Sequence, residues 1–332
     1  MNKGFSIIEF MIAITLGALI VATVGSVYLS NKATYRVQEE LARLQENARY
    51  ANYYLNFTLR MAGFQGCASE SFVKMTNRVK SPSKMLLYDT PVLGYDGLAS
   101  SFSPTLPANL TAKIVTGTDA VEVRMASLTG VQLRDDMNQS INPILVYDRL
   151  GIQAGDVVMI SDCSVGDIFI AGGNTNSTAI THTVTNNNTN ELSASYISGS
   201  QVMRYVYYAF YIKDTGRINA NSQPIYALVR QDLDGTEQEL VDGIEKMTIR
   251  YGVDTNADNT ADEYQTATAV NSANNWNKVI SLKINLLFAT VENVNNKPQA
   301  YQFNGATITP TDRKLRREWQ TFVTIRNRGL PS

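Results

Sequence analysis

The chain begins, over residues 1–30, with MNKGFSIIEFMIAITLGALIVATVGSVYLS. A polar leader, residues 1–4, precedes an apolar run from Phe5 to Leu29 that contains one strong charge, Glu9. A helix needs about 20 apolar residues to cross a bilayer core, so the run is long enough. A carboxylate there costs about 2.5–3.5 kcal/mol on insertion scales, so we expect Glu9 to have a partner. The alternative is a plain N-terminal anchor that tolerates one Glu.

The leader differs from an ordinary secretory signal, which would be cut after its apolar stretch. No A-x-A site closes the run, and the natural cut lies at Gly4-Phe5. The pattern G-F-S-I-I-E-F resembles the type IV pilin class of leaders. That resemblance implies cleavage after Gly4 by a prepilin peptidase, N-methylation of the Phe5 amine, and a salt bridge from Glu9 to the N-terminus of a neighbouring subunit. In lipid the two charges cost less together than apart.

A helical pattern continues from Asn31 to Ala62 with small and apolar residues at alternating steps of four and three. This spacing predicts one apolar stripe along a helix. No Pro occurs before Pro82, and Gly63 is the expected stop. About 58 residues at 1.5 Å each give a helix of roughly 87 Å. The stripe consists of Val37, Leu41, Leu44, Ala48, Ala51, Leu55, Leu59 and Ala62.

The end of this helix carries a second, narrower resemblance. Residues 60–67 read RMAGFQGC, with LARLQENARY just upstream. Together they resemble the PilW family of minor pilins, in which such a helix ends in a similar turn. Further matching pieces are Asp162-Cys163 with Ile168-Phe169 shortly after, Tyr251-Gly252-Val253-Asp254, and Thr324-Ile325-Arg326-Asn327.

This resemblance implies an α+β, type IV pilin-like fold, in which one long N-terminal helix packs on a large β-rich head. The expected division is a leader (residues 1–4), a transmembrane and assembly helix (5–29), its amphipathic continuation (30–62) and the head (63–332). The expected location is the inner membrane, single-pass with the head in the periplasm, and then the pilus at the cell surface.

The same resemblance implies a structural role rather than an enzyme: a minor pilin that initiates assembly or forms the tip complex of a type IV pilus, and so serves twitching motility, adhesion or DNA uptake. The implied partners are the prepilin peptidase, other minor pilins, the major pilin, a tip adhesin, and membrane lipid before assembly. A J-type pseudopilin of type II secretion and an adhesin-like binding module are the alternatives. The sequence contains no nucleophile elbow, P-loop or metal-hydrolase motif.

From Phe72 onward, short runs of Val, Ile, Tyr and Phe alternate with Gly, Asn, Asp and Pro, which predicts a mainly β head. Lys278–Ala289 alternates clearly, with Ile280, Leu282, Ile284, Leu286 and Phe288 on one face and Ser281, Lys283 and Asn285 on the other. The other predicted strands are Ala120–Ala126, Ile144–Asp148, Val157–Ser161, Asp167–Ala171, Arg204–Lys213, Ile225–Gln231 and Glu318–Arg326.

Composition narrows the function classes further. The 332 residues carry a formal net charge of −1, which argues against a dedicated nucleic-acid binder. The single His182 excludes a multi-His metal site, and its Thr-rich surroundings predict an exposed strand or loop. If the head lies outside the cytoplasm, Cys67 and Cys163 can form a disulfide that closes a loop of about 95 residues and contributes about 4 kcal/mol. Two buried free thiols are the alternative.

Three polar stretches remain. Asp254, Asn256, Asp258, Thr260 and Asp262 place oxygen atoms at every second residue, as an EF-hand calcium loop does. Asn259 replaces its glycine and Gln265 its bidentate Glu, so the alternative is a hairpin turn. Residues 172–200, rich in Asn and Thr, predict a surface insertion. The basic residues 313–317 predict a solvated face, with DNA or anionic lipid as the other interpretation.

Overall fold

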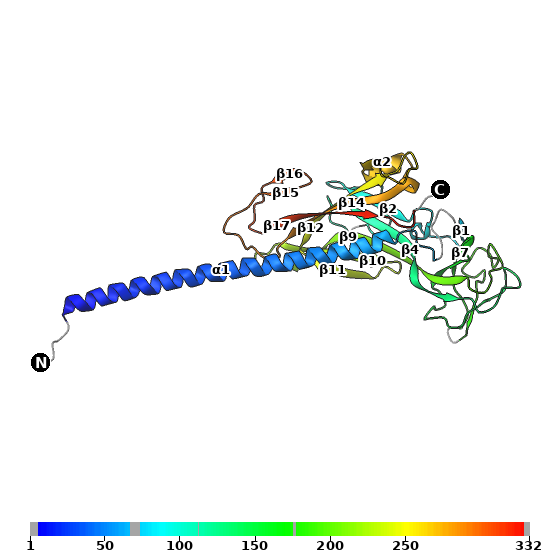
Figure 1. Ribbon diagram of the computed structural model, residues 1–332, viewed down its shortest axis with the longest axis horizontal. Coiled ribbons are helices and arrows are strands. Elements are labelled where there is room, and N and C mark those ends of the chain that lie inside the picture. Colours follow the sequence, from blue (N-terminus) through cyan, green and yellow to red (C-terminus); the bar gives the residue numbers. More distant parts are fainter. Residues whose placement is uncertain (1–5, 67–73, 112, 175–176, 329–332) are drawn as a thin grey trace.

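One long helix and a β-rich head make up the molecule, so the α+β prediction is confirmed. The computed structural model describes residues 6–66, 74–111, 113–174 and 177–328. Helix α1 (Ile7–Arg60) runs for 54 residues, and Figure 1 shows its first half projecting away from the head while its second half lies along it.

The predicted stripe on the second half of α1 is the face that meets the head. Its members from Leu44 onward are all buried, whereas Val37 and Leu41, nearer the point where the helix leaves the head, are half-buried. The helix ends at Arg60, and Gly63 follows with a positive φ of 74°. Glycine adopts that backbone conformation without the strain that a Cβ would cause, which explains why the chain turns there.

The larger of the two main sheets has nine strands within the described residues. Its main path is β1-β7-β6-β9-β4-β2-β3, and β10 pairs with both β9 and β11. All its pairings are antiparallel except that of β1 with β7. The strands are β1 (Lys74–Asn77), β2 (Val92–Gly97), β3 (Phe102–Ser103), β4 (Ala120–Gln132), β6 (Val157–Ser161), β7 (Val165–Ile170), β9 (Gln201–Ile218), β10 (Pro224–Asp232) and β11 (Glu237–Asp242).

The smaller sheet is antiparallel and has the order β13-β12-β14-β17. It consists of β12 (Ile244–Val253), β13 (Glu263–Gln265), β14 (Val279–Ala289) and β17 (Arg316–Thr324). Two short ladders pair β5 (Ile144–Leu145) with β8 (Ala179–Ile180), and β15 (Tyr301–Phe303) with β16 (Ala306–Ile308). The remaining elements are α2 (Ala267–Ser272) and the 3₁₀ turns η1 (Lys84–Leu86) and η2 (Trp276–Lys278).

The main core lies between α1, the inner face of the smaller sheet and part of the larger one. Leu282, Ile284 and Phe288 of β14 point into it, as the alternation predicts, together with Leu55 and Leu59 of α1. The two sheets approach closely at Gly94, where a Cβ would lie 1.8 Å from the Tyr251 hydroxyl. Only glycine fits at that contact.

Asp119 joins the two sheets through its carboxylate. One oxygen accepts from the Gly97 N–H of β2 at 2.8 Å, and the other accepts from the Ile249 N–H of β12 at 2.7 Å. Burial raises the pKa of the Asp119 carboxyl to about 6, although the two backbone donors act in the opposite direction.

Most of the described residues in the predicted surface insertion, residues 172–200, are exposed, but some of its side chains are buried. Leu192 and Tyr196 are buried in a third core cluster together with Phe169. His182 is only 3% exposed; its ring packs edge-on against Phe169 with centroids 5.7 Å apart, and its Nε2 lies 2.9 Å from the Asn142 carbonyl oxygen. The prediction of an exposed His182 was wrong, because the polar segment wraps over apolar residues that are distant in sequence.

Candidate functional site

The N-terminus of α1 is closed by its own side chains. Ser6 and Glu9 form a capping box: the Glu9 carboxylate accepts from the Ser6 N–H at 3.0 Å, and the Ser6 hydroxyl accepts from the Ile8 N–H at 3.3 Å. Such a cap satisfies backbone donors that have no partner within the helix. The S-x-x-E spacing is a signal for this cap in the sequence itself. Glu9 is exposed, so its carboxylate can exchange this local partner for one on another molecule.

The first half of α1 is apolar and uncovered. Among the described residues, α1 is the one helix long and apolar enough to cross a membrane; its most apolar 18-residue window has a mean hydropathy of 2.4 and no buried residue. The hydroxyls of Thr15 and Thr23 donate to the carbonyls of Met11 and Leu19 at 2.9 and 3.0 Å. Because these polar groups are satisfied within the helix, they are compatible with lipid. The apolar helix therefore fits membrane anchoring.

Polar contacts reinforce the docking of the second half of α1 on the head. Asn47 donates to the Asp242 carbonyl at 3.2 Å, and Asn56 donates to the Thr321 hydroxyl of β17 at 3.0 Å. Arg230 of β10 donates to the Tyr54 hydroxyl. These contacts lie on both sides of the buried stripe and involve three different strands, so the helix is held in one register against the head.

The end of α1 is bound by the end of the chain. The Arg326 N–H donates to the Arg60 carbonyl at 3.1 Å, and the Asn327 side chain donates to the Ala62 carbonyl at 3.3 Å. The Gly63 N–H in turn donates to the Arg124 carbonyl of β4 at 2.9 Å. Carbonyls left open at a helix C-terminus thereby find partners. The MAG turn and the TIRN segment, which are far apart in sequence, meet at this point.

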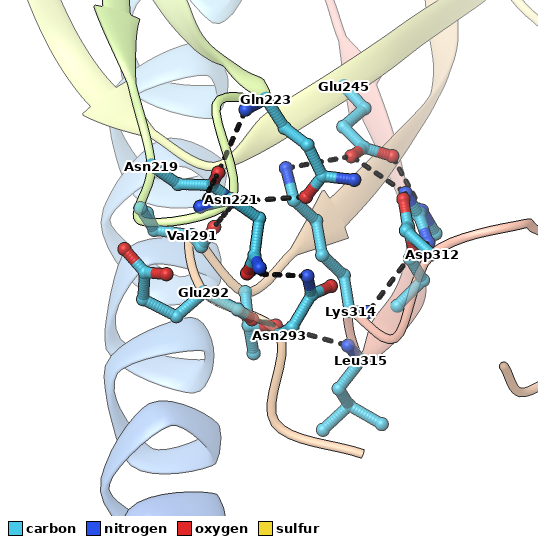
Figure 2. A network of polar contacts seen from close by, with 12 residues as sticks. Asn219, Asn221, Gln223, Glu245, Val291, Glu292, Asn293, Asp312, Lys314 and Leu315 are labelled. Carbon is cyan, nitrogen blue, oxygen red and sulfur yellow. Dashed lines mark hydrogen bonds and ion pairs between the residues drawn. The ribbon is translucent and has the colours of Figure 1, made fainter. Parts of the chain in front are cut away.

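A polar network surrounds the place where α1 leaves the head (Figure 2). It joins the β9–β10 turn, the segment after β14 and the segment before β17. Asn219 donates to the Val291 carbonyl at 2.8 Å, and Asn293 donates to the Asn221 amide oxygen at 2.7 Å. Thr290 accepts from the Leu315 N–H at 3.0 Å. The network holds three loops together beside the helix.

The basic residues 313–317 take part in this network rather than forming a solvated face. Arg316 is 8% exposed and donates to both oxygens of Glu245, at 2.6 and 3.0 Å, and to both oxygens of Asp312, at 2.6 Å each. Hydrogen bonds from Arg316 lower the pKa of the Asp312 carboxyl. The Lys314 ammonium lies 3.6 Å from Glu245. The prediction of a solvated face was wrong for Lys314 and Arg316, because carboxylates from elsewhere in the head enclose them.

Residues 209–327 match the family model of PilW, described as type IV pilus-assembly protein W. This region is PilW-like. It contains the smaller sheet, most of the residues in Figure 2 and the TIRN segment that binds the end of α1. No curated protein and no solved structure matches the chain significantly.

The acidic loop of the PilW-like region is a hairpin turn between β12 and β13. The Asp254 carboxylate accepts from the N–H groups of Ala257 and Asn259 at 2.7 and 2.8 Å, and Asp262 accepts from the Thr255 N–H at 2.7 Å. Asp258 accepts from the Thr260 N–H at 2.7 Å. These oxygens are used within the loop.

Two residues of this loop adopt a left-handed backbone conformation although neither is glycine. Ala257 and Asn259 have positive φ angles of 63° and 69°.

In the described part of the chain, no three or more His, Cys, Asp or Glu side chains are grouped so that they could hold a metal ion. The oxygen atoms of Asp254, Asn256, Asp258, Thr260 and Asp262 are the right chemical type for calcium, and calcium binding there stays a prediction of the sequence.

Other predicted site residues lie outside the described part of the chain. Gly4 and Phe5, the expected cleavage and methylation residues, precede Ser6. Cys67 belongs to the undescribed residues 67–73, while Cys163 occupies the β6–β7 turn with a φ of 72°. Leader cleavage, N-methylation and the Cys67–Cys163 disulfide therefore stay predictions.

Sequence reasoning missed one buried ion pair in the larger sheet. Glu122 and Arg124 of β4 are each 1% exposed and bonded to one another. Arg124 also donates to the carbonyls of Thr90 and Met85, and Glu122 accepts from the Tyr207 hydroxyl at 2.8 Å. The pair is satisfied on all sides, which indicates a structural role.

Proposed function

We propose that this protein is a minor pilin that takes part in initiating a type IV pilus or in forming its tip complex. The observation that carries the proposal is the uncovered, apolar first half of α1. An exposed apolar surface of that size is not stable in water, and it is accommodated by lipid before assembly and by neighbouring helices afterwards.

Glu9 supports assembly with other subunits rather than anchoring alone. A mere anchor gains nothing from a carboxylate that costs free energy in lipid. After cleavage at Gly4-Phe5, the Phe5 ammonium of one subunit and Glu9 of its neighbour would neutralise each other. The neighbours would be other minor pilins and the major pilin, and the head would be in the periplasm before it reaches the cell surface. A tip adhesin that sits on the assembled minor pilins would be a further partner.

The PilW-like match supports a pilus role more than a secretion role, and it supports a structural subunit more than an enzyme. The matched region is the part that receives α1, as the contacts of Tyr54, Asn56 and Arg60 show.

The test is mass spectrometry of sheared surface filaments and of the membrane pellet from the same cells. The proposal predicts trace recovery in the filaments of a peptide that begins with N-methylated Phe5. Glu9→Gln should remove the protein from the filaments while leaving it in the membrane. Glu39→Gln, an exposed charge change on the same helix beyond its apolar half, is the matched control and should leave recovery unchanged.

Two outcomes would contradict the proposal. A processed protein that stays wholly with the cells, in a strain whose loss of this gene blocks protein export but not twitching, would indicate a J-type pseudopilin. A chain that keeps Met1 in both fractions would reject the pilin interpretation itself.

A further inference from the structure

The outer face of the smaller sheet, on the side away from α1, carries a polar pocket of about 470 Å³. Residues of strands β12, β14 and β17 form its floor, and Asn304 and Gly305, at the tip of the β15–β16 hairpin, form one wall. The register aligns its floor in rows: Arg250 pairs with Lys283, and Asn285 pairs with Thr248 and Gln320. The volume lies within the range of small-ligand sites.

The hairpin wall is held in place by hydrogen bonds. The Asn304 N–H donates to the Glu318 carboxylate at 3.0 Å, and the Asn304 amide nitrogen donates to the Thr248 hydroxyl at 2.9 Å. Asn304 has a φ of 52°, and Gly305 beside it has a φ of 79°, as a tight turn requires. The pocket is therefore preorganised, which lowers the entropy cost of binding.

Asn285, on the pocket floor, has an unused acceptor. It is 9% exposed, and its amide nitrogen donates to Asn304 at 2.6 Å and to Glu318 at 2.8 Å. The carboxylate of Glu318 can only accept, so this orientation of the amide is fixed. The Asn285 amide oxygen has no hydrogen-bond partner among the described residues. This oxygen is itself buried, so ligand hydroxyls contact the exposed Gln320 side chain on the neighbouring strand instead.

The other end of the pocket is positively charged. Neither Arg250 nor Lys283 forms an ion pair within the described residues, although they are direct neighbours across β12 and β14. The one acid that lines the pocket, Glu318, is engaged by Asn285 and Asn304. Two adjacent unpaired cations match a carboxylate, which guanidinium groups bind in bidentate geometry.

An aromatic surface lies beside the cations. Phe322 is the register neighbour of Lys283 on β17, and the Lys283 ammonium lies 5.7 Å from its ring centroid. Phe322 is 57% exposed, and Tyr264 packs against it edge-on at 5.8 Å. An exposed ring next to hydrogen-bonding groups provides a flat apolar surface for the C–H face of a sugar.

We propose that this pocket binds an acidic saccharide. The carboxylate of a uronic acid residue contacts Arg250 and Lys283, and a ring hydroxyl contacts Gln320. The next sugar unit lies over Phe322. This binding does not depend on assembly into a filament, so its test is separate from that of the proposed function.

The experiment is isothermal titration calorimetry of the full-length protein in detergent micelles with a galacturonate trisaccharide. The wild type should bind it, and Arg250→Gln or Lys283→Gln should weaken the affinity at least about tenfold, since each removes a charge-assisted hydrogen bond. Arg317→Gln is the matched control: Arg317 is an exposed cation on β17 that does not line the pocket, and its removal should leave the affinity unchanged.

The methyl ester of the same trisaccharide keeps the hydroxyls and lacks the charge, and we expect it to bind at least about tenfold more weakly. The proposal is overturned if the trisaccharide shows no binding up to about 10 mM. It is also overturned if Arg250→Gln and Lys283→Gln bind like the wild type, or if inorganic phosphate displaces the sugar with equal affinity, since the pocket would then be a simple anion site.

Discussion

Arg316→Ala is the substitution that most directly tests how the head is held together beside α1. Arg316 makes four hydrogen bonds to the carboxylates of Glu245 and Asp312, whose side chains are only 16% and 15% exposed. Its removal leaves two largely buried negative charges with only the Lys314 ammonium, 3.6 Å from Glu245, to offset them. Breaking a buried ion pair on one side typically costs about 3–5 kcal/mol. We expect a loss of about 3 kcal/mol in the free energy of unfolding, because the carboxylates retain some contact with water.

The assay is urea unfolding of the full-length protein in detergent, followed by tryptophan fluorescence. Trp276 is buried against Tyr251 with ring centroids 5.0 Å apart, so its emission reports the core of the head. Arg317→Ala, which removes the next residue's exposed cation, is the control. It should change the unfolding free energy by less than about 0.5 kcal/mol, as surface substitutions usually do.

The pH dependence gives a second test of the same reasoning. Hydrogen bonds from Arg316 hold the pKa of Asp312 below its ordinary value of 3.8. A lowered carboxyl pKa stabilises the fold above the unfolded-state pKa, and that contribution is lost as the pH falls through the folded-state value. The difference between Arg316→Ala and wild type should therefore shrink below about pH 4. A variant as stable as Arg317→Ala at pH 7, or an equal deficit at pH 7 and pH 3, would refute the reasoning.

Three further predictions concern α1, the contact between the sheets, and the acidic loop. Leu55→Ala, in the buried stripe of α1, should lower the unfolding free energy by about 2–5 kcal/mol in the same urea assay, whereas the exposed Tyr53→Ala should leave it nearly unchanged. The pKa of Asp119 is raised to about 6, so the folded state binds more protons than the unfolded state between about pH 4 and 6, and this group's contribution to stability falls as the pH rises through that window. Asp119→Asn should flatten that slope in unfolding curves measured across the window, and an unchanged slope would contradict the assignment. If the loop from Asp254 to Asp262 binds calcium, added calcium should raise the melting temperature of the protein, and Asp254→Ala should abolish that rise. Equal melting temperatures in calcium and in chelator would reject the site.

The sequence predicts the long helix well because its signal is local. An apolar run of sufficient length, a stripe at steps of four and three, and a glycine at the end are properties of neighbouring residues. The buried positions from Leu44 to Ala62 follow that stripe. Val157–Ser161 forms a strand with the predicted bounds, and Leu282, Ile284, Leu286 and Phe288 of β14 enter the core as the alternation predicts, whereas Ile280 is only half-buried.

Other elements depended on contacts that the sequence does not show. The predicted strand Ile144–Asp148 shortens to Ile144–Leu145, and β17 begins two residues earlier than expected and ends at Thr324. Strand β12, Ile244–Val253, was not predicted at all, although it pairs along nearly its whole length with β14. Met247, Ile249, Tyr251 and Val253 alternate with polar or small residues and are all buried, so the period of two that marks a strand was present in the sequence and was overlooked.

By itself, the sequence determined that this chain has a long N-terminal helix, whose first half is apolar enough to cross a membrane, and a β-rich head. Hydrophobic periodicity is enough for that, since it depends only on residues close together in the sequence. The tertiary structure decided which polar residues are buried and which remain available: it enclosed Arg316 and His182, and it left Arg250 and Lys283 unpaired beside one another on the outer sheet. The reason is physical. Whether a charged side chain is buried and paired or remains exposed depends on the carboxylates and carbonyls that folding brings next to it. These groups come from distant segments, which the pattern of neighbouring residues in the sequence does not identify.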